Sequence, residues 1–108
     1  MKIGINYLKL KDIKPGTVLT IVDRMDIETH PAKPYIFIHR KNKKQFNFSF
    51  VFGMLEYCGQ KFTVVKLDEH QKVYTKEGHG FSFSLSMFQE MNPFDPEIIW
   101  KHENFTKK

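Results

Sequence analysis

The sequence predicts a small all-β domain, and two features of the 108-residue chain support this prediction. Phenylalanine recurs at every second position, at Phe46, Phe48, Phe50 and Phe52, and a period of two places these rings on one face of a strand. Short β-branched and aromatic runs alternate with turn residues at intervals of about 8–12 residues, which are typical of sandwiches and barrels. With 41% hydrophobic and 15% aromatic residues, the chain can fill one packed core.

An internal near-repeat indicates how the domain is organised. Residues 16–22 resemble 59–65, and residues 46–52 resemble 81–87, in the same order along the chain. We therefore expect two related β units, at 14–52 and 57–88, inside a single compact domain that spans 1–108. A C-terminal extension follows over 92–108. The first unit carries roughly eight additional residues, which a surface loop accommodates at little entropic cost.

Local composition places the expected elements. Strands are expected where β-branched and aromatic residues cluster, over 3–7, 17–22, 35–39, 46–52, 62–67, 73–75 and 81–85. The polar segment 23–34 contains two prolines and predicts a loop, and 54–58 predicts a short turn or a helical turn.

The C-terminal part leaves one choice open. Residues 83–91 fit a long strand, or a strand that ends in a helical turn capped by Ser84 or Ser86. Asp95 and Pro96 have the residue types of an N-cap and a first helical position, so we expect a short C-terminal helix. Six of the strands would form two three-stranded meanders. The pattern predicts a small SH3-like barrel or two fused three-stranded β units, with that helix added.

Residues 54–91 also carry a pattern of spaced aromatic and small residues. It consists of Tyr57-Cys58-Gly59, Thr63-Val64, Tyr74, Gly80, Phe83-Ser84 and Met87-Phe88. On these residues the segment resembles small bacteriophage and prophage proteins of unassigned role that contain an SH3-like β-barrel. The resemblance covers about a third of the chain and departs at 83–86, where the pattern has a Trp and an acidic pair. It implies a fold and a phage origin, and it implies no site residue.

Composition limits the compartment and the covalent chemistry. Cys58 is the single cysteine, which excludes an internal disulfide and fits a reducing compartment. No run of about 18 apolar residues is present, so we expect no transmembrane span and no membrane partner. The N-terminus lacks the apolar core of a signal peptide. We therefore expect a cytoplasmic protein, in the host cytoplasm if a phage encodes it.

No catalytic or metal-binding pattern is found. The five histidines are His30, His39, His70, His79 and His102. None forms a short-spaced ligand pair with another histidine or with Cys58, as zinc sites normally do. Cys58 has no adjacent base and fits a small packing residue better than a nucleophile. We expect a protein that is not an enzyme, with no catalytic residue, no metal and no cofactor.

The strongest functional candidate is the segment 40–44, which we call the basic turn. Arg40, Lys41, Lys43 and Lys44 place four positive charges within five residues at an expected hairpin tip. Such a tip can reach a phosphate backbone without burying charge. The alternative is a solvated turn, or a turn whose charges prevent exposed strand edges from pairing.

Side chains before the basic turn extend the candidate site. Tyr35 and Phe37, if they point outward, would offer stacking platforms for bases. The candidate binding set, for protein or nucleic acid, is Tyr35, Phe37, His39, Arg40, Lys41, Lys43 and Lys44.

The charge distribution and the absence of catalytic motifs favour a binding function. The net charge is +5, and residues 1–54 hold ten basic and four acidic side chains, against seven and eight in 55–108. This imbalance fits a polyanionic partner, or an ordinary surplus of surface lysines. We expect a non-enzymatic binding module, a phage-encoded effector that binds a host protein. The alternative is a nucleic-acid-binding module that uses the basic turn.

Overall fold

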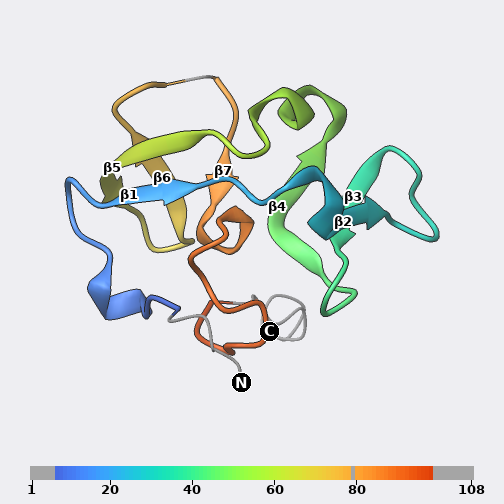
Figure 1. Cartoon of the computed structure of the whole chain (residues 1–108), viewed down its shortest axis with the longest axis horizontal. Helices are drawn as coiled ribbons and strands as arrows, with labels where there is room; N and C mark the ends of the chain where they lie inside the picture. The colour runs from blue at the N-terminus through green and yellow to red at the C-terminus, as the bar shows by residue number, and fades with distance from the viewer. Residues whose placement is uncertain (1–6, 79, 99–108) are drawn as a thin grey trace.

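The protein folds into two antiparallel β-sheets that lie side by side (Figure 1). The structure is a computed structural model, and it describes residues 7–78 and 80–98. The strands are β1 (Val18–Thr20), β2 (Ile27–Thr29), β3 (Ile36–His39), β4 (Gln45–Val51), β5 (Lys61–Leu67), β6 (Lys72–Thr75) and β7 (Phe83–Ser84). Short 3₁₀ segments are η1 (Leu10–Asp12), η2 (Arg24–Asp26), η3 (Phe52–Tyr57) and η4 (Leu85–Met87). The all-β fold class expected from the sequence is confirmed.

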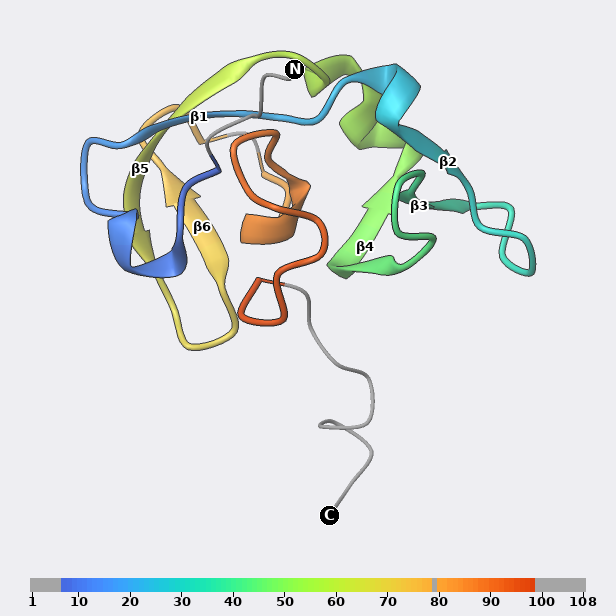
Figure 2. The same ribbon diagram turned by 60° about the horizontal axis from the view of Figure 1, so that its bottom comes forward.

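The two sheets have the strand orders β1-β5-β6-β7 and β2-β3-β4. All neighbouring strands are antiparallel. Figure 2 shows the same arrangement from a second side, with β5 and β6 in one sheet and β2, β3 and β4 in the other. β4 packs against both β7 and η4, so these contacts join the two sheets.

The division of strands between the sheets differs from the expected pair of three-stranded units. β1 belongs to the first half of the chain, yet it pairs with β5, where Val18 lies opposite Thr63. The place left beside β3 is taken by β2, which lies inside the segment expected to be a loop. Ile27 is fully buried there and pairs with His39. Ile27 is the only apolar residue of β2, and this was too weak a signal for a strand.

The phenylalanine stripe of β4 is only partly a core face. The register of β4 against β3 shifts, since Phe37 opposes Phe50 but Ile38 opposes Gln45. This bulge leaves Phe48 half-buried, whereas Phe46 and Phe50 are buried. β4 ends at Val51, so Phe52 does not continue the stripe and is 61% exposed. The expectation that Phe52 lies on the core face was wrong.

The structure decides between the two alternatives for residues 83–91. β7 ends at Ser84 and is followed directly by η4, so the strand ends in a helical turn. Ser84 precedes this turn without capping it, and its hydroxyl lies 3.1 Å from that of Ser86. Two of the three η4 residues, Leu85 and Met87, are fully buried, which explains why the chain turns inward here.

The chain ends lie partly outside the described residues. At Asp95 the carboxylate accepts the Glu97 N–H at 2.9 Å, and the backbone carbonyl accepts the Ile98 N–H at 2.9 Å. These bonds form one turn, and the rest of the expected C-terminal helix falls in residues that the structure does not describe. Most of the strand expected over 3–7 also falls there, and Leu8 forms a bridge with Met91.

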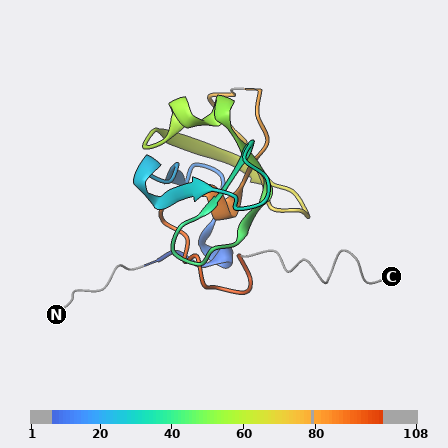
Figure 3. The same ribbon diagram turned by 90° about the vertical axis from the view of Figure 1, so that its right-hand side faces the viewer.

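One buried cluster connects both sheets. Its members include Ile27, Phe37 and Phe50 from the three-stranded sheet and Phe62 and Phe83 from the four-stranded sheet. Aromatic edge-to-face contacts run through this cluster, for example between Phe62 and Phe83, with ring centroids 5.3 Å apart. In Figure 3 the 3₁₀ segment η3 lies at one end of the molecule and the orange turn after η4 at the other.

Candidate binding surfaces

The basic turn connects β3 to β4, as the sequence predicts. Lys43 N–H donates to the His39 carbonyl at 2.8 Å, and His39 N–H donates to the Lys44 carbonyl at 3.0 Å. Lys43 has a left-handed φ of 61°, which the tight turn imposes on it. Asn42 anchors the turn, because its side-chain oxygen accepts the Lys44 N–H at 2.9 Å and its amide donates to the Pro93 carbonyl.

Arg40 folds back onto η2 and β2 instead of extending into solvent. Its Nε–H donates to the Met25 carbonyl at 2.7 Å, and one terminal nitrogen donates to the Ile27 carbonyl at 3.1 Å. The other terminal nitrogen lies 3.4 Å from the Glu28 carboxylate. The guanidinium group of Arg40 therefore donates to acceptors of both η2 and β2. Arg40 has a structural role, and most of its donors are already engaged.

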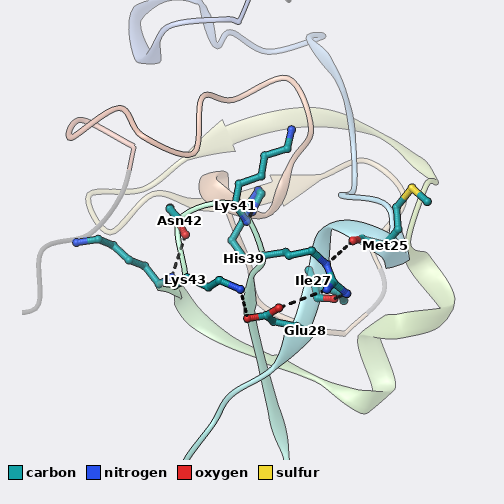
Figure 4. Close-up of polar contacts among 9 residues, drawn as sticks. Met25, Ile27, Glu28, His39, Lys41, Asn42 and Lys43 are labelled. Atoms are coloured by element: carbon teal, nitrogen blue, oxygen red, sulfur yellow. Dashed lines mark hydrogen bonds and ion pairs between the residues drawn. The ribbon is translucent and has the colours of Figure 1, made fainter.

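Glu28 also engages Lys43, whose ammonium lies 2.8 Å from the carboxylate (Figure 4). The hydrogen bond from Lys43, together with the attraction of Arg40, holds the pKa of Glu28 below its ordinary value. The carboxylate is therefore charged at neutral pH and offsets part of the positive charge of the turn. An exposed pair of this kind adds little stability, but it directs both cations toward the protein's own carboxylate.

Lys41 and Lys44 remain as the cations of the turn that make no ion pair with a described carboxylate. Lys41 lines a cleft next to the turn, and Lys44 lines a much smaller cavity of about 10 Å³. That smaller cavity has room for about one water molecule. The basic turn thus presents fewer available charges than its sequence indicates.

The residues expected beside the turn do not join it in one surface. Tyr35 is exposed, but it precedes β3 and so lies at the end of that strand opposite the turn. Phe37 is only 2% exposed. Its ring packs edge-on against Phe50 and Phe52, and the Arg24 guanidinium lies 5.3 Å above it. Phe37 is therefore a core residue and offers no stacking platform for a base.

His39 is also buried, with 7% of its surface exposed. Burial lowers the pKa of His39 below its ordinary value, Asp26 opposes this shift, and Lys41 adds to it. A buried, neutral imidazole does not contribute positive charge to the turn. His39 therefore lies beneath the surface of the turn, and its place in the candidate binding set stays a prediction.

A second surface, which we call the aromatic ridge, was not expected from the sequence. It consists of Phe52, Tyr57 and Phe81 around Gly53. Phe52 is 61% exposed and Phe81 is 37% exposed. The rings of Tyr57 and Phe81 meet edge-on with centroids 6.0 Å apart. A Cβ atom on Gly53 would lie 2.6 Å from the Phe81 ring, so only glycine lets this ring rest on the backbone of η3.

The aromatic ridge and the basic turn lie at opposite ends of β4. The turn precedes Gln45, and η3 begins directly after Val51. Figures 1 and 3 both show η3 at one end of the three-stranded sheet and the turn at the other. One signal in the sequence could have located the ridge, namely that Gly53 interrupts the phenylalanine stripe immediately after Phe52. The partner ring at Phe81 could not be deduced without the tertiary structure.

Three further observations concern metal binding, Cys58 and membrane-spanning helices. No group of three or more His, Cys, Asp or Glu side chains among them could hold a metal ion. Burial raises the pKa of the Cys58 thiol, and the side chain packs against the core, as a packing residue does. No helix within the described residues has the length and apolar character needed to cross a membrane.

No family model matches the chain, and neither the curated proteins nor the solved structures yield a match.

Proposed function

We propose that this protein is a non-enzymatic binding module that recognises another protein through the aromatic ridge. The observation that carries the proposal is Phe52, a large aromatic side chain that is 61% exposed although it directly follows the buried stripe of β4. The 3₁₀ segment that bears Phe52 also fixes Tyr57, and Gly53 seats the ring of Phe81. The ridge is therefore a preformed surface, which lowers the ordering cost of association.

The composition of the ridge favours a protein partner. Aromatic side chains, methionine and arginine are enriched at the centres of protein interfaces, whereas lysine and glutamate are depleted there. Arg24 lies over the same Phe37 ring that Phe52 contacts, with its guanidinium 5.3 Å from the ring centroid. Met25, the next residue, is highly exposed. An exposed arginine and methionine thus lie beside the ridge, as expected at the centre of an interface.

The resemblance of residues 54–91 to small phage proteins indicates what kind of partner to test. Tyr57 and Phe81 of the ridge fall within that segment. Under this proposal the chain is a phage-encoded effector, and its partner is a protein of the host cytoplasm. The charges of the basic turn would then speed the encounter, since peripheral charges steer association more than they hold a complex.

Affinity capture from a nuclease-treated bacterial lysate tests the proposal. Phe52→Ser should lose a protein that the unaltered chain retains, because a central aromatic contact commonly carries about 2 kcal/mol or more of binding energy. Phe94→Ser is the matched control, since Phe94 is 62% exposed and lies in the turn after η4. Gly53→Ala is a second ridge variant, because its added methyl group displaces the Phe81 ring.

Two results would overturn the protein-binding proposal. One is equal capture by Phe52→Ser, Gly53→Ala and Phe94→Ser, which would show that the ridge plays no part. The other is a protein that the unaltered chain captures from an untreated lysate but does not capture at all from the nuclease-treated lysate. Circular dichroism of each variant confirms that the fold is intact before capture is compared.

Nucleic-acid binding stays as a second candidate because Lys41 and Lys44 have no ion pair among the described residues. The measurement is the affinity for duplex DNA as a function of salt. If these lysines contact phosphates, replacing both by serine should reduce the log–log salt slope by about 0.9 for each lost contact. Phe52→Ser should leave that slope unchanged. An unaltered protein that does not bind DNA at low salt would exclude this candidate.

A further inference from the structure

A cleft of about 350 Å³ opens where the basic turn, the end of β1 and the segment after η4 come together. Its charged and polar walls include Asp23, Asp26, His39, Lys41 and Glu90. The volume lies at the small end of the range of about 300–1,000 Å³ for small-molecule sites. The cleft borders the basic turn, at the other end of β4 from the aromatic ridge, so it is independent of the proposed protein-binding surface.

His39 points to a ligand with a hydrogen-bond acceptor. The Lys41 backbone N–H donates to His39 Nδ1 at 3.2 Å, so the proton of the neutral ring is on Nε2. The ring is more than nine-tenths buried and lines the cleft. No described residue accepts a hydrogen bond from Nε2. Buried donors are rarely left without an acceptor, so a bound acceptor would satisfy this group.

Lys41 supplies a positive charge on the same wall. Figure 4 shows the side chains of Lys41 and His39 on the same side of the turn, away from Glu28. The Lys41 ammonium makes no ion pair with a described carboxylate. An ammonium beside an imidazole N–H forms a pair of donors suited to one carboxylate of a ligand.

Three carboxylates also line the cleft, and the charge of one of them, Asp26, acts on His39. Asp23 accepts from the Gln89 amide at 3.1 Å, and Glu90 accepts from the Thr20 N–H at 2.8 Å. The Asp26 carboxylate has no hydrogen bond or ion pair with any described residue. The carboxylates of Asp23, Asp26 and Glu90 thus outnumber the single ammonium of Lys41.

Neither a simple anion nor a simple cation satisfies both the donors of Lys41 and His39 and the three carboxylates. A bare anion would be repelled by the carboxylates, and a bare cation would leave Lys41 and His39 without an acceptor. A metal ion is not favoured either, since no group of described side chains has the arrangement to hold one. The remaining chemistry is a ligand that carries both charges.

We propose that this cleft binds a small zwitterion of the size of a basic amino acid. The carboxylate of the ligand pairs with Lys41 and His39 Nε2–H. Its ammonium or guanidinium group pairs with Asp26, with Asp23 and Glu90 nearby. The fit rests on complementary charge at both ends, which gives specificity against molecules that carry only one of the two groups.

Three probes with related carbon chains separate the contributions of the two ends. L-arginine carries both charges, agmatine lacks the carboxylate, and pentanoate lacks the cation. Each is titrated into the full chain at millimolar concentrations and followed by calorimetry and by amide shifts. Arginine should bind more tightly than either probe, with shifts at Lys41 and Met91 and at the His39 ring. Binding of agmatine equal to that of arginine, or no binding of arginine, would overturn the proposal.

Two substitutions test the cationic and the acidic groups of the cleft separately. Lys41→Met and Asp26→Asn should each weaken arginine binding about tenfold or more, since each removes a charge-assisted contact. Neither side chain makes a hydrogen bond or ion pair with a described residue, so both variants should fold. Lys44→Met is the matched control from the same turn, because Lys44 does not line this cleft. Equal weakening by Lys44→Met would indicate a nonspecific charge effect and would overturn the assignment.

Discussion

Arg40 shows how far the role of a charged residue depends on its neighbours. Its sequence context indicates an exposed cation, yet its side chain bonds to the carbonyls of Met25 and Ile27. Its backbone N–H also donates to the Asp26 carbonyl at 2.7 Å. Arg40 thus holds η2 and the start of β2 against the hairpin.

We expect Arg40→Met to lower the free energy of unfolding by about 1–3 kcal/mol, because two hydrogen bonds of about 0.5–1.5 kcal/mol each are lost. Lys44→Met should change it by less than about 0.5 kcal/mol, as exposed substitutions usually do. Urea denaturation of both variants provides the comparison. Equal midpoints would mean that the Arg40 contacts contribute nothing measurable.

His39 should make the stability of the protein depend on pH. Its pKa is below the ordinary value of 6.5 in the folded state because burial disfavours the charged ring. The unfolded chain therefore binds more protons than the folded chain. The contribution of His39 to stability is complete above about pH 6.5 and is lost as the pH falls through the lower folded pKa.

The measurement is urea denaturation at about pH 8 and about pH 5.5, a window in which an ordinary histidine changes its charge. His39→Gln should reduce the loss of stability between these two values. The exposed His70 gives the control substitution, His70→Gln, which should retain the loss. A pH dependence that is the same in both variants would contradict the role assigned to His39.

At the scale of elements, β4 combines core and surface positions within one regular pattern. Its alternation places Phe46 and Phe50 in the core. The register shift against β3 leaves Phe48 half-buried, and the change to η3 leaves Phe52 outside. A period of two therefore predicts a face of a strand, but it does not predict where the strand bulges or ends.

Alanine substitutions in β4 and at the first residue of η3 should rank by burial. Phe50→Ala should cost about 3–5 kcal/mol, the usual cost of truncating a buried phenylalanine. Phe52→Ala should cost about 1 kcal/mol, which corresponds to its single edge-on contact with Phe37. Phe48→Ala should fall between these values. Denaturation midpoints give the ranking, and a cost for Phe52→Ala as large as that for Phe50→Ala would contradict the exposed position of Phe52.

At the scale of the whole molecule, the pairing of β1 with β5 ties the two halves together. Leu19 and Ile21, in and just after β1, are fully buried within the common core. Without them, the sheet formed by the second half would lose an edge strand and part of its apolar cover.

We therefore expect the fragment 55–108 to be unfolded when it is produced alone. Loss of β1 exposes the edge of β5 and removes buried surface that a domain of this size needs. The amide spectrum of the fragment should show narrow dispersion, and addition of fragment 1–54 should restore it. A well-dispersed spectrum of 55–108 alone would show that the second β unit is independent.

Much of the local structure was predictable from the sequence, whereas much of the candidate site was not. The strands β3, β5 and β6 and the basic turn fall where β-branched runs and turn residues indicate them, because these preferences act between near neighbours. The number of unpaired charges on the basic turn depends on Glu28, which precedes Arg40 by 12 residues and Lys43 by 15. Periodicity says nothing about such a partner.

The sequence by itself determined that the chain forms an all-β fold with a phenylalanine-rich core and a charged hairpin turn. Backbone preference, hydrophobic alternation and glycine or proline punctuation are local properties, and each can be read from a few consecutive residues. The tertiary structure decided which sheet β1 joins, that Phe37 and His39 are buried, and that the Phe81 ring packs against Gly53, the residue after the exposed Phe52. These outcomes depend on contacts between distant segments, where competition for the same buried space selects one arrangement among several that the local patterns allow.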